Sequence, residues 1–199
     1  YPPGLAPPPS AYLVALEFPG TSPNFHYSNP LWTNTALRNS AVSGGTERKT
    51  SAFFTATSIV KLEIVRSGTT TSVELPIVGA SLSLHQIFNG GYLATNGDLA
   101  EWRALSGYSY QQNCNRQGFN IQGQTAHGGV SSNRDARIGI YFNDQNNCDW
   151  LKSGRVIGGT FTSAAAGCTA MCSDRRVRSD VWVRISVLAV LVPPPPPYP

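Results

Sequence analysis

The sequence predicts a mainly β protein, an antiparallel β-sandwich or jelly roll with one or two short helices. Short segments of β-branched and apolar residues recur along the chain, and the connections between them are rich in Gly, Ser and Asn. Charged residues make up only 13% of the 199 residues, whereas a typical soluble domain has about 25%. A surface that is polar but weakly charged favours a secreted or cell-surface protein over a cytosolic enzyme.

The chain divides into one folded domain between two proline-rich ends. Residues 1–10 read YPPGLAPPPS and residues 193–199 read PPPPPYP. Residues 11–192 are enough for one sizeable hydrophobic core, and they contain no internal repeat. We therefore expect a single β-sandwich domain over 11–192, flanked by an N-terminal and a C-terminal proline-rich segment.

Three segments carry the clearest strand patterns. Residues 11–18 (AYLVALEF) predict a short apolar strand, and residues 51–78 predict a hairpin because β-branched alternation lies on both sides of a turn at Gly68. Residues 180–192 (DVWVRISVLAVLV) predict the strongest strand. Its first half alternates and its second half is apolar on both faces, which indicates a central strand or one that a partner covers.

The middle of the chain predicts two helices, a loop and two further strands. Residues 81–88 and 97–105 place apolar residues at helical spacing. Residues 107–135 turn to Gly, Ser, Asn and Gln, which predicts a long polar loop. Residues 136–142 and 155–161 predict strands that an Asn-rich turn connects.

The four cysteines indicate disulfides rather than a metal site. They are even in number, and no two have the two-residue spacing of zinc or redox motifs. Three pairings are possible, and we favour Cys114 with Cys148 and Cys168 with Cys172. Free cytosolic thiols are the alternative.

No catalytic motif stands out, and we expect no catalytic residues and no enzyme activity. GxSxG, HExxH, GxGxxG and phosphate-loop patterns are absent, and the few carboxylates are scattered. A secreted hydrolase would need two of those carboxylates to converge in space. The basic run at 175–178 (RRVR) lacks the accompanying features of a nucleic-acid site, and no apolar run approaches the length of a membrane span.

The turn YFNDQNNCDW gathers oxygen-bearing side chains that suit a calcium ion or a sugar, although such clusters also make ordinary turns. We otherwise expect no metal and no cofactor. The candidate glycan or calcium contacts are Asn143, Asp144, Asn146, Asn147, Asp149 and Trp150.

A family resemblance accompanies these residues. The segment GFNIQGQTAHGGVSSNRDARIGIYFNDQNNCDW, with Cys114 just upstream, and the run PPPPP resemble extracellular modules of algal hydroxyproline-rich surface glycoproteins, such as cell-wall, pherophorin-like and flagellar-hair proteins. The resemblance implies an extracellular location and glycosylated hydroxyprolines. The absence of any N-x-S/T sequon agrees with glycans linked to hydroxyproline, Ser or Thr.

The proline runs suggest a structural role. Consecutive prolines form a stiff polyproline II rod without backbone donors, so they cannot continue a sheet. We expect a structural protomer of an extracellular filament or surface coat, a homopolymer assembled head to tail through its terminal strands and proline-rich segments. The expected assembly residues are Tyr12, Val14, Leu16, Val187, Leu188, Val190, Leu191, Pro193, Pro194, Pro195, Pro196 and Pro197.

Two alternatives remain open from the sequence. In the first, the terminal strands pair within their own domain and the prolines link it to other modules. In the second, the protein is a secreted carbohydrate-binding, lectin-like module that grips glycans with residues 107–135 and 143–150.

Overall fold

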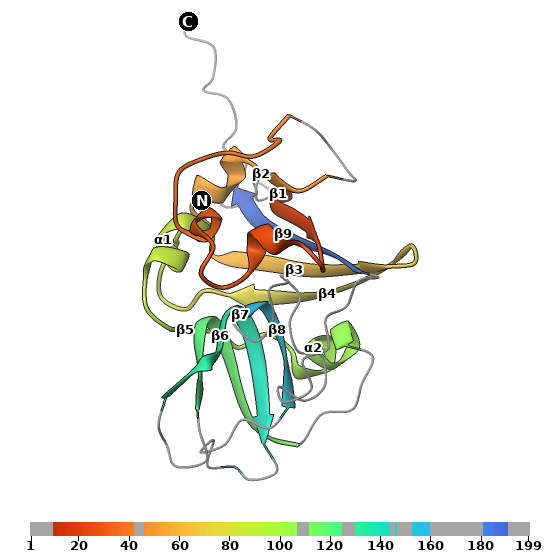
Figure 1. Ribbon diagram of the computed structural model, residues 1–199, viewed down its shortest axis with the longest axis vertical. Helices are drawn as coiled ribbons and strands as arrows, with labels where there is room; N and C mark the ends of the chain where they lie inside the picture. The colour runs from red at the N-terminus through yellow and green to blue at the C-terminus, as the bar shows by residue number, and fades with distance from the viewer. Residues whose placement is uncertain are drawn as a thin grey trace, which may run out of the picture.

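Two antiparallel sheets make up the molecule in the computed structural model, which describes residues 10–41, 46–106, 112–124, 130–143, 146, 153–159 and 181–190. One sheet has the order β2-β1-β9-β3-β4 and the other the order β5-β6-β7-β8. In Figure 1, β3 and β4 run across the view whereas β6, β7 and β8 run down it. The predicted mainly β class with short helices is confirmed, as a sandwich of two sheets whose strands cross at a large angle.

The elements follow one another along the chain as strands with short helical turns between them. The strands are β1 (Ser10–Pro19), β2 (Arg48–Lys49), β3 (Ile59–Arg66), β4 (Thr69–Pro76), β5 (Leu93–Ala94), β6 (Asn113–Gln124), β7 (Val130–Asn143), β8 (Ser153–Gly159) and β9 (Val181–Val190). The helices are α1 (Leu84–Asn89), α2 (Leu99–Ser106) and short 3-10 helices at Pro23–Phe25, Pro30–Trp32 and Ser51–Phe54.

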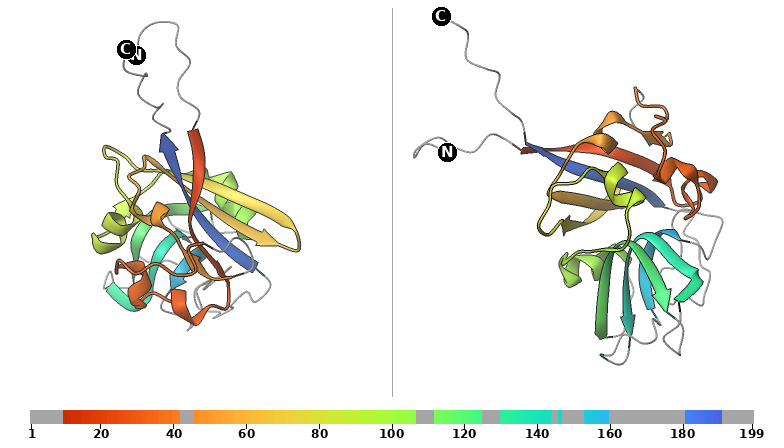
Figure 2. Two further views of the ribbon diagram at one scale, coloured as in Figure 1. Left: turned by 90° about the horizontal axis from the view of Figure 1, so that it is seen from above. Right: turned by 90° about the vertical axis from the view of Figure 1, so that its left-hand side faces the viewer.

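The first and last strands pair with each other. β1 and β9 are antiparallel, with Ser10 opposite Val190 and Pro19 opposite Trp182. β9 also pairs with β3 on its other side, so it is a central strand, as its apolar second half predicted. Figure 2 shows β1 and β9 side by side, with the start of β1 and the end of β9 at the same end of the sheet.

The predicted hairpin is formed by β3 and β4, with eight residue pairs in unbroken register. Its turn consists of Ser67 and Gly68, which have φ angles of +47° and +80°. Positive φ at both turn residues matches the twist of the two strands, which explains the glycine.

Residues 107–135 are not the long polar loop that the sequence predicted. β6 begins at Asn113, and β7 reaches back to Val130. Register shifts in the β6–β7 pairing and a left-handed residue, Asn120 at φ +46°, interrupt the alternation in β6. The prediction failed because the inward positions Phe119 and Ile121 are the only large apolar residues of that strand.

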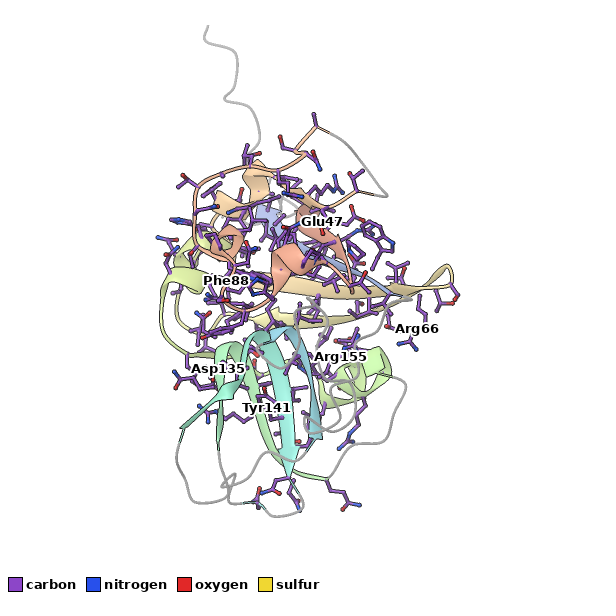
Figure 3. The ribbon with its side chains drawn as sticks, in the orientation of Figure 1. Glu47, Arg66, Phe88, Asp135, Tyr141 and Arg155 are labelled. Atoms are coloured by element: carbon purple, nitrogen blue, oxygen red, sulfur yellow. The ribbon has the colours of Figure 1, made fainter. Side chains whose placement is uncertain are left out.

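One apolar core joins both sheets. Leu62 and Ile185 of the five-stranded sheet belong to the same buried cluster as Phe119 and Ile138 of the four-stranded sheet. Phe88 of α1, labelled in Figure 3, packs edge-on against Trp32 at 4.8 Å between ring centroids. Among the described residues, no helix combines the length and the apolar character that crossing a bilayer would need.

Candidate functional site: the open edge of β1

The outer side of β1 is paired along only half of its length. β2 contacts β1 at Leu16 and Glu17 alone. Residues 10–14 therefore have β9 on one side, and within the described parts of the chain no strand lies on the other side. We call these residues the open edge.

The direction of the main-chain groups follows from a contact on the far side of β9. The hydroxyl of Thr57 accepts a hydrogen bond from the N–H of Leu188 at 3.1 Å and donates one to its carbonyl at 3.0 Å. The main chain of Leu188 thus points away from β1, and Tyr12 lies directly opposite Leu188. In an antiparallel pair of this kind the N–H and C=O of Tyr12 also point outward, to the open side.

The open edge ends at Val14, where Thr50 lies beside β1. The Thr50 N–H donates to the carbonyl of Ala15 at 3.0 Å, and its hydroxyl donates to the carbonyl of Val14 at 2.7 Å. The chain then turns away into the 3-10 helix Ser51–Phe54, where Ala52 N–H bonds the Thr50 hydroxyl. The hydrogen bonding of β2 and Thr50 to β1 therefore ends where the open edge begins.

A groove of about 370 Å³ lies beside the open edge. Leu13 is 39% exposed there, although its neighbours Ala15 and Leu16 are fully buried. The depression has the position that a further strand of the sheet would occupy. Its lining residues are Tyr12, Leu13, Val14, Arg48, Thr50, Ser51, Ala52 and Thr55.

The open edge carries none of the features that usually prevent strands from associating. Proteins protect edges with charges, prolines, bulges or a covering element. Residues 10–14 read SAYLV, without charge or proline, whereas the bulge between Val14 and Leu16 and the proline at Pro19 lie in the other half of β1. The accessible half is thus the unprotected half.

The opposite edge of the same sheet is covered. α2 packs against β4, where Trp102 and Leu105 are buried. The Glu101 carboxylate accepts a hydrogen bond from the outward N–H of Glu74 at 3.3 Å. Pro76 at the end of β4 has no N–H to offer. These contacts cover the second half of β4, whereas Thr69 and Thr70 at its start are exposed.

A buried lysine fixes the closed half. Lys49 of β2 is fully buried, and its Nζ donates to the carbonyls of Leu31 and Asn34 at 2.7 and 2.6 Å. The ammonium also lies 4.1 Å from the ring centroid of Phe53. Desolvation by this burial lowers the pKa of Lys49 from 10.5 to about 8. No pattern in the sequence predicts this contact, because a lone lysine after a polar loop usually lies in solvent.

Charged side chains further secure β2 against β1. Glu17 accepts hydrogen bonds from Arg48 Nε at 2.7 Å and from Arg184 Nη2 at 2.8 Å, which ties β2, β1 and β9 together. Glu47, which directly precedes β2 and is labelled in Figure 3, lies 3.2 Å from Arg38 and accepts a hydrogen bond from Asn24 at 2.7 Å. The residues of the open edge themselves carry no charge.

The expected assembly residues separate into different environments. Tyr12 and Val14 lie on the open edge, whereas Leu16 is buried in the closed half. Val187 and Leu188 lie in central β9, and Val190 ends it. Leu191 and Pro193 to Pro197 lie outside the described residues.

The remaining predicted residues fall largely beyond what the structure describes. Cys148, Cys168 and Cys172 lie outside it, and Cys114 is placed in β6 by its main chain only. Asn143 ends β7 and is buried, and Asn146 lies in an exposed turn. Asp144, Asn147, Asp149 and Trp150 are outside the described residues. Within the described residues, no group of three or more His, Cys, Asp or Glu side chains gathers as a metal site would require.

Within the described residues, the fold and this site define a β-sandwich whose first strand has an accessible edge. Comparisons with protein-family models, with curated proteins and with solved structures give no match for this chain.

Proposed function

We propose that this protein is a structural protomer of an extracellular filament or surface coat, built from copies of itself. The observation that supports this function most is the open edge, five uncharged residues of which every second one turns its main-chain groups outward, beside a groove. Such an edge adds strands through main-chain hydrogen bonds, and side-chain contacts then set the register.

The contact between copies that we propose for β1 is addition to its open edge, and the proline-rich segments supply the head-to-tail connection of the homopolymer. Donating β1 or β9 to a neighbour would break the nine residue pairs that join the two strands within one chain. Addition at the open edge breaks none of them. This mode keeps the terminal strands in the contact between copies, but as a docking edge and not as an exchanged segment.

The proline-rich ends fit the same proposal. Residues 1–9 precede Ser10 and residues 191–199 follow Val190, and these two residues are neighbours in the sheet. Prolines offer no N–H, so they stop strand pairing and serve as stiff spacers. We propose that they carry hydroxyl-linked glycans and connect the domains of the assembly outside the cell.

Sedimentation velocity and electron microscopy of the purified chain test the proposal. We expect association that increases with concentration and ordered fibres or sheets in the images. Leu13→Lys, which places a charge in the groove, should reduce assembly at least tenfold, while Leu37→Lys at a similarly exposed position should not. A wild-type chain that stays monomeric at millimolar concentration would refute the proposed function.

A further inference from the structure

The open edge has features that identify its occupant. We propose that it binds the open edge of a second copy in antiparallel orientation, so that Tyr12 lies opposite the partner's Tyr12 and the two five-stranded sheets become continuous. This inference rests on the proposed function and specifies one of its contacts. A two-fold contact of this kind uses the same surface on both copies.

The length of the edge matches the strand that would fill it. On one side the edge ends where Thr50 and β2 close it, at Val14. On the other side Pro9 precedes Ser10, and proline cannot donate to a ladder. The segment available for pairing and the gap available for it are thus the same five residues.

This match selects one register. Ser10, Tyr12 and Val14 turn their main-chain groups outward, since these directions repeat every second residue. With Tyr12 on the two-fold axis, Ser10 lies opposite the partner's Val14, and the outward groups of the two strands face each other; the Val14 carbonyl also accepts the Thr50 hydroxyl. A shift by two residues in one direction brings Ser10 opposite Leu16, which β2 already pairs, and a shift in the other brings Val14 opposite Pro8.

The side chains agree with self-pairing. In this register Leu13 lies opposite the partner's Ala11, and such non-bonded pairs bring side chains closest. The contact would cover Leu13, which is exposed although apolar. The chain carries a net charge of +4, but residues 10–14 have no charged side chain, and Arg48 in the groove beside them is paired with Glu17.

Edge pairing of this kind closes at two copies. A two-fold contact uses the β1 edge of both copies, and at the other edge of the five-stranded sheet α2 and Glu101 lie against the second half of β4. The pair therefore has no second equivalent edge to continue the sheet. Growth of a filament beyond the pair would then require a second contact, which the proline-rich segments at the two ends of the chain would provide.

A proline substitution tests the central contact. Tyr12→Pro removes the outward N–H of residue 12 and leaves the pairing of Ala11 and Leu13 with β9 available. We expect the dimer dissociation constant in sedimentation equilibrium to rise roughly tenfold or more. Tyr12→Phe, which keeps the main chain intact, should leave the dissociation constant unchanged.

A charge-pair experiment tests the register on a shared background. Ser10→Lys with Val14→Glu places opposite charges across the proposed two-fold contact, and Ser10→Glu with Val14→Glu places like charges there. Both variants carry Val14→Glu, so any cost of that change to folding is common. We expect the Lys–Glu variant to dimerise roughly tenfold more tightly at low salt. Equal dissociation constants would overturn the proposed register.

The outcomes separate this inference from the proposed function. If the wild-type chain forms assemblies that Tyr12→Pro and the charge pairs leave unaffected, the two-fold contact is wrong and the structural role stands. If the wild-type chain does not associate at any concentration, both are wrong. If dimers form and follow the expected order of affinities, the contact is established.

Discussion

The two edges of the five-stranded sheet differ in how far their outward main-chain groups are covered. At β4 a helix packs along the strand, and a carboxylate accepts one outward N–H. At β1 a two-residue strand pairs with one half, and no strand within the described residues pairs with the other. This difference is consistent with the self-pairing that we propose, because an unpaired strand edge is a template for association.

The largest expected effect comes from removing the cover of β4. Trp102 is fully buried, and its indole N–H donates to the Gln117 side chain at 2.9 Å. Trp102→Ala should lower the free energy of unfolding by about 3–5 kcal/mol in chemical denaturation, since it leaves a cavity and removes one of the two hydrogen bonds that the Gln117 side-chain oxygen accepts, the other coming from Thr95. Ala100→Ser, at an exposed position of α2, should change it by less than about 0.5 kcal/mol. Equal effects of the two changes would show that α2 does not depend on this contact.

A second prediction concerns the lysine that closes half of β1. The pKa of Lys49 is about 8 in the folded chain and 10.5 ordinarily. Between these values the unfolded chain binds more protons, so the stability contributed by this group rises with pH from about 8 to 10.5. The gain should reach about 3 kcal/mol relative to Lys49→Met, measured by urea denaturation across that range.

Lys61→Met provides the control for Lys49. Lys61 lies on β3 and is partly exposed, 3.4 Å from Glu63. This variant should keep the rise in stability between pH 8 and 10.5. A wild-type profile that is flat over the same range would show that Lys49 does not carry a lowered pKa.

A smaller effect is expected where the two edges are linked across the face of the sheet. The Tyr12 hydroxyl on β1 donates to Glu74 on β4 at 2.6 Å. Burial and this carboxylate raise the pKa of Tyr12, because both disfavour the phenolate. Tyr12→Phe should cost about 1 kcal/mol in thermal or chemical unfolding. If Tyr12→Phe changes neither the free energy of unfolding nor dimerisation, the hydrogen bond between Tyr12 and Glu74 is too exposed to contribute to stability.

The smallest effect is expected at the helix that caps β4. Glu101→Gln keeps an oxygen that accepts the N–H of Glu74 but removes the charge. The free energy of unfolding should fall by no more than about 0.5 kcal/mol, because the contact is exposed and 3.3 Å long. Glu101→Ala should show the larger loss of the two, and the reverse order would contradict the capping role.

The sequence predicted the parts of the fold that follow regular patterns. The alternation around Gly68 located the hairpin, and the apolar second half of residues 180–192 indicated the central strand. The long loop prediction failed at β6 because a left-handed Asn120 and shifted pairing hide the two-residue period. β2 consists of only two residues, too few to produce a pattern.

The site was less accessible to sequence reasoning than the fold. Tyr12 and Val14 were recognised as residues of a terminal strand, but their exposure depends on where β2 ends. That end is set by Thr50 and by the buried Lys49, contacts between segments far apart in the chain. Leu16, chosen with them, proves to be buried, because pattern alone does not tell which stretch of a strand has a neighbour.

The adjacency of Ser10 and Val190 has a mechanical consequence. A load applied through the two flanking segments would pull β1 and β9 apart from that end, so their ladder would open one rung after another at low force. The first rungs to separate belong to residues 10–14, and stretching should therefore release a neighbour docked there before the core yields. Single-molecule pulling with handles at the two termini should show an early, low-force extension, and a single high-force rupture would contradict this expectation.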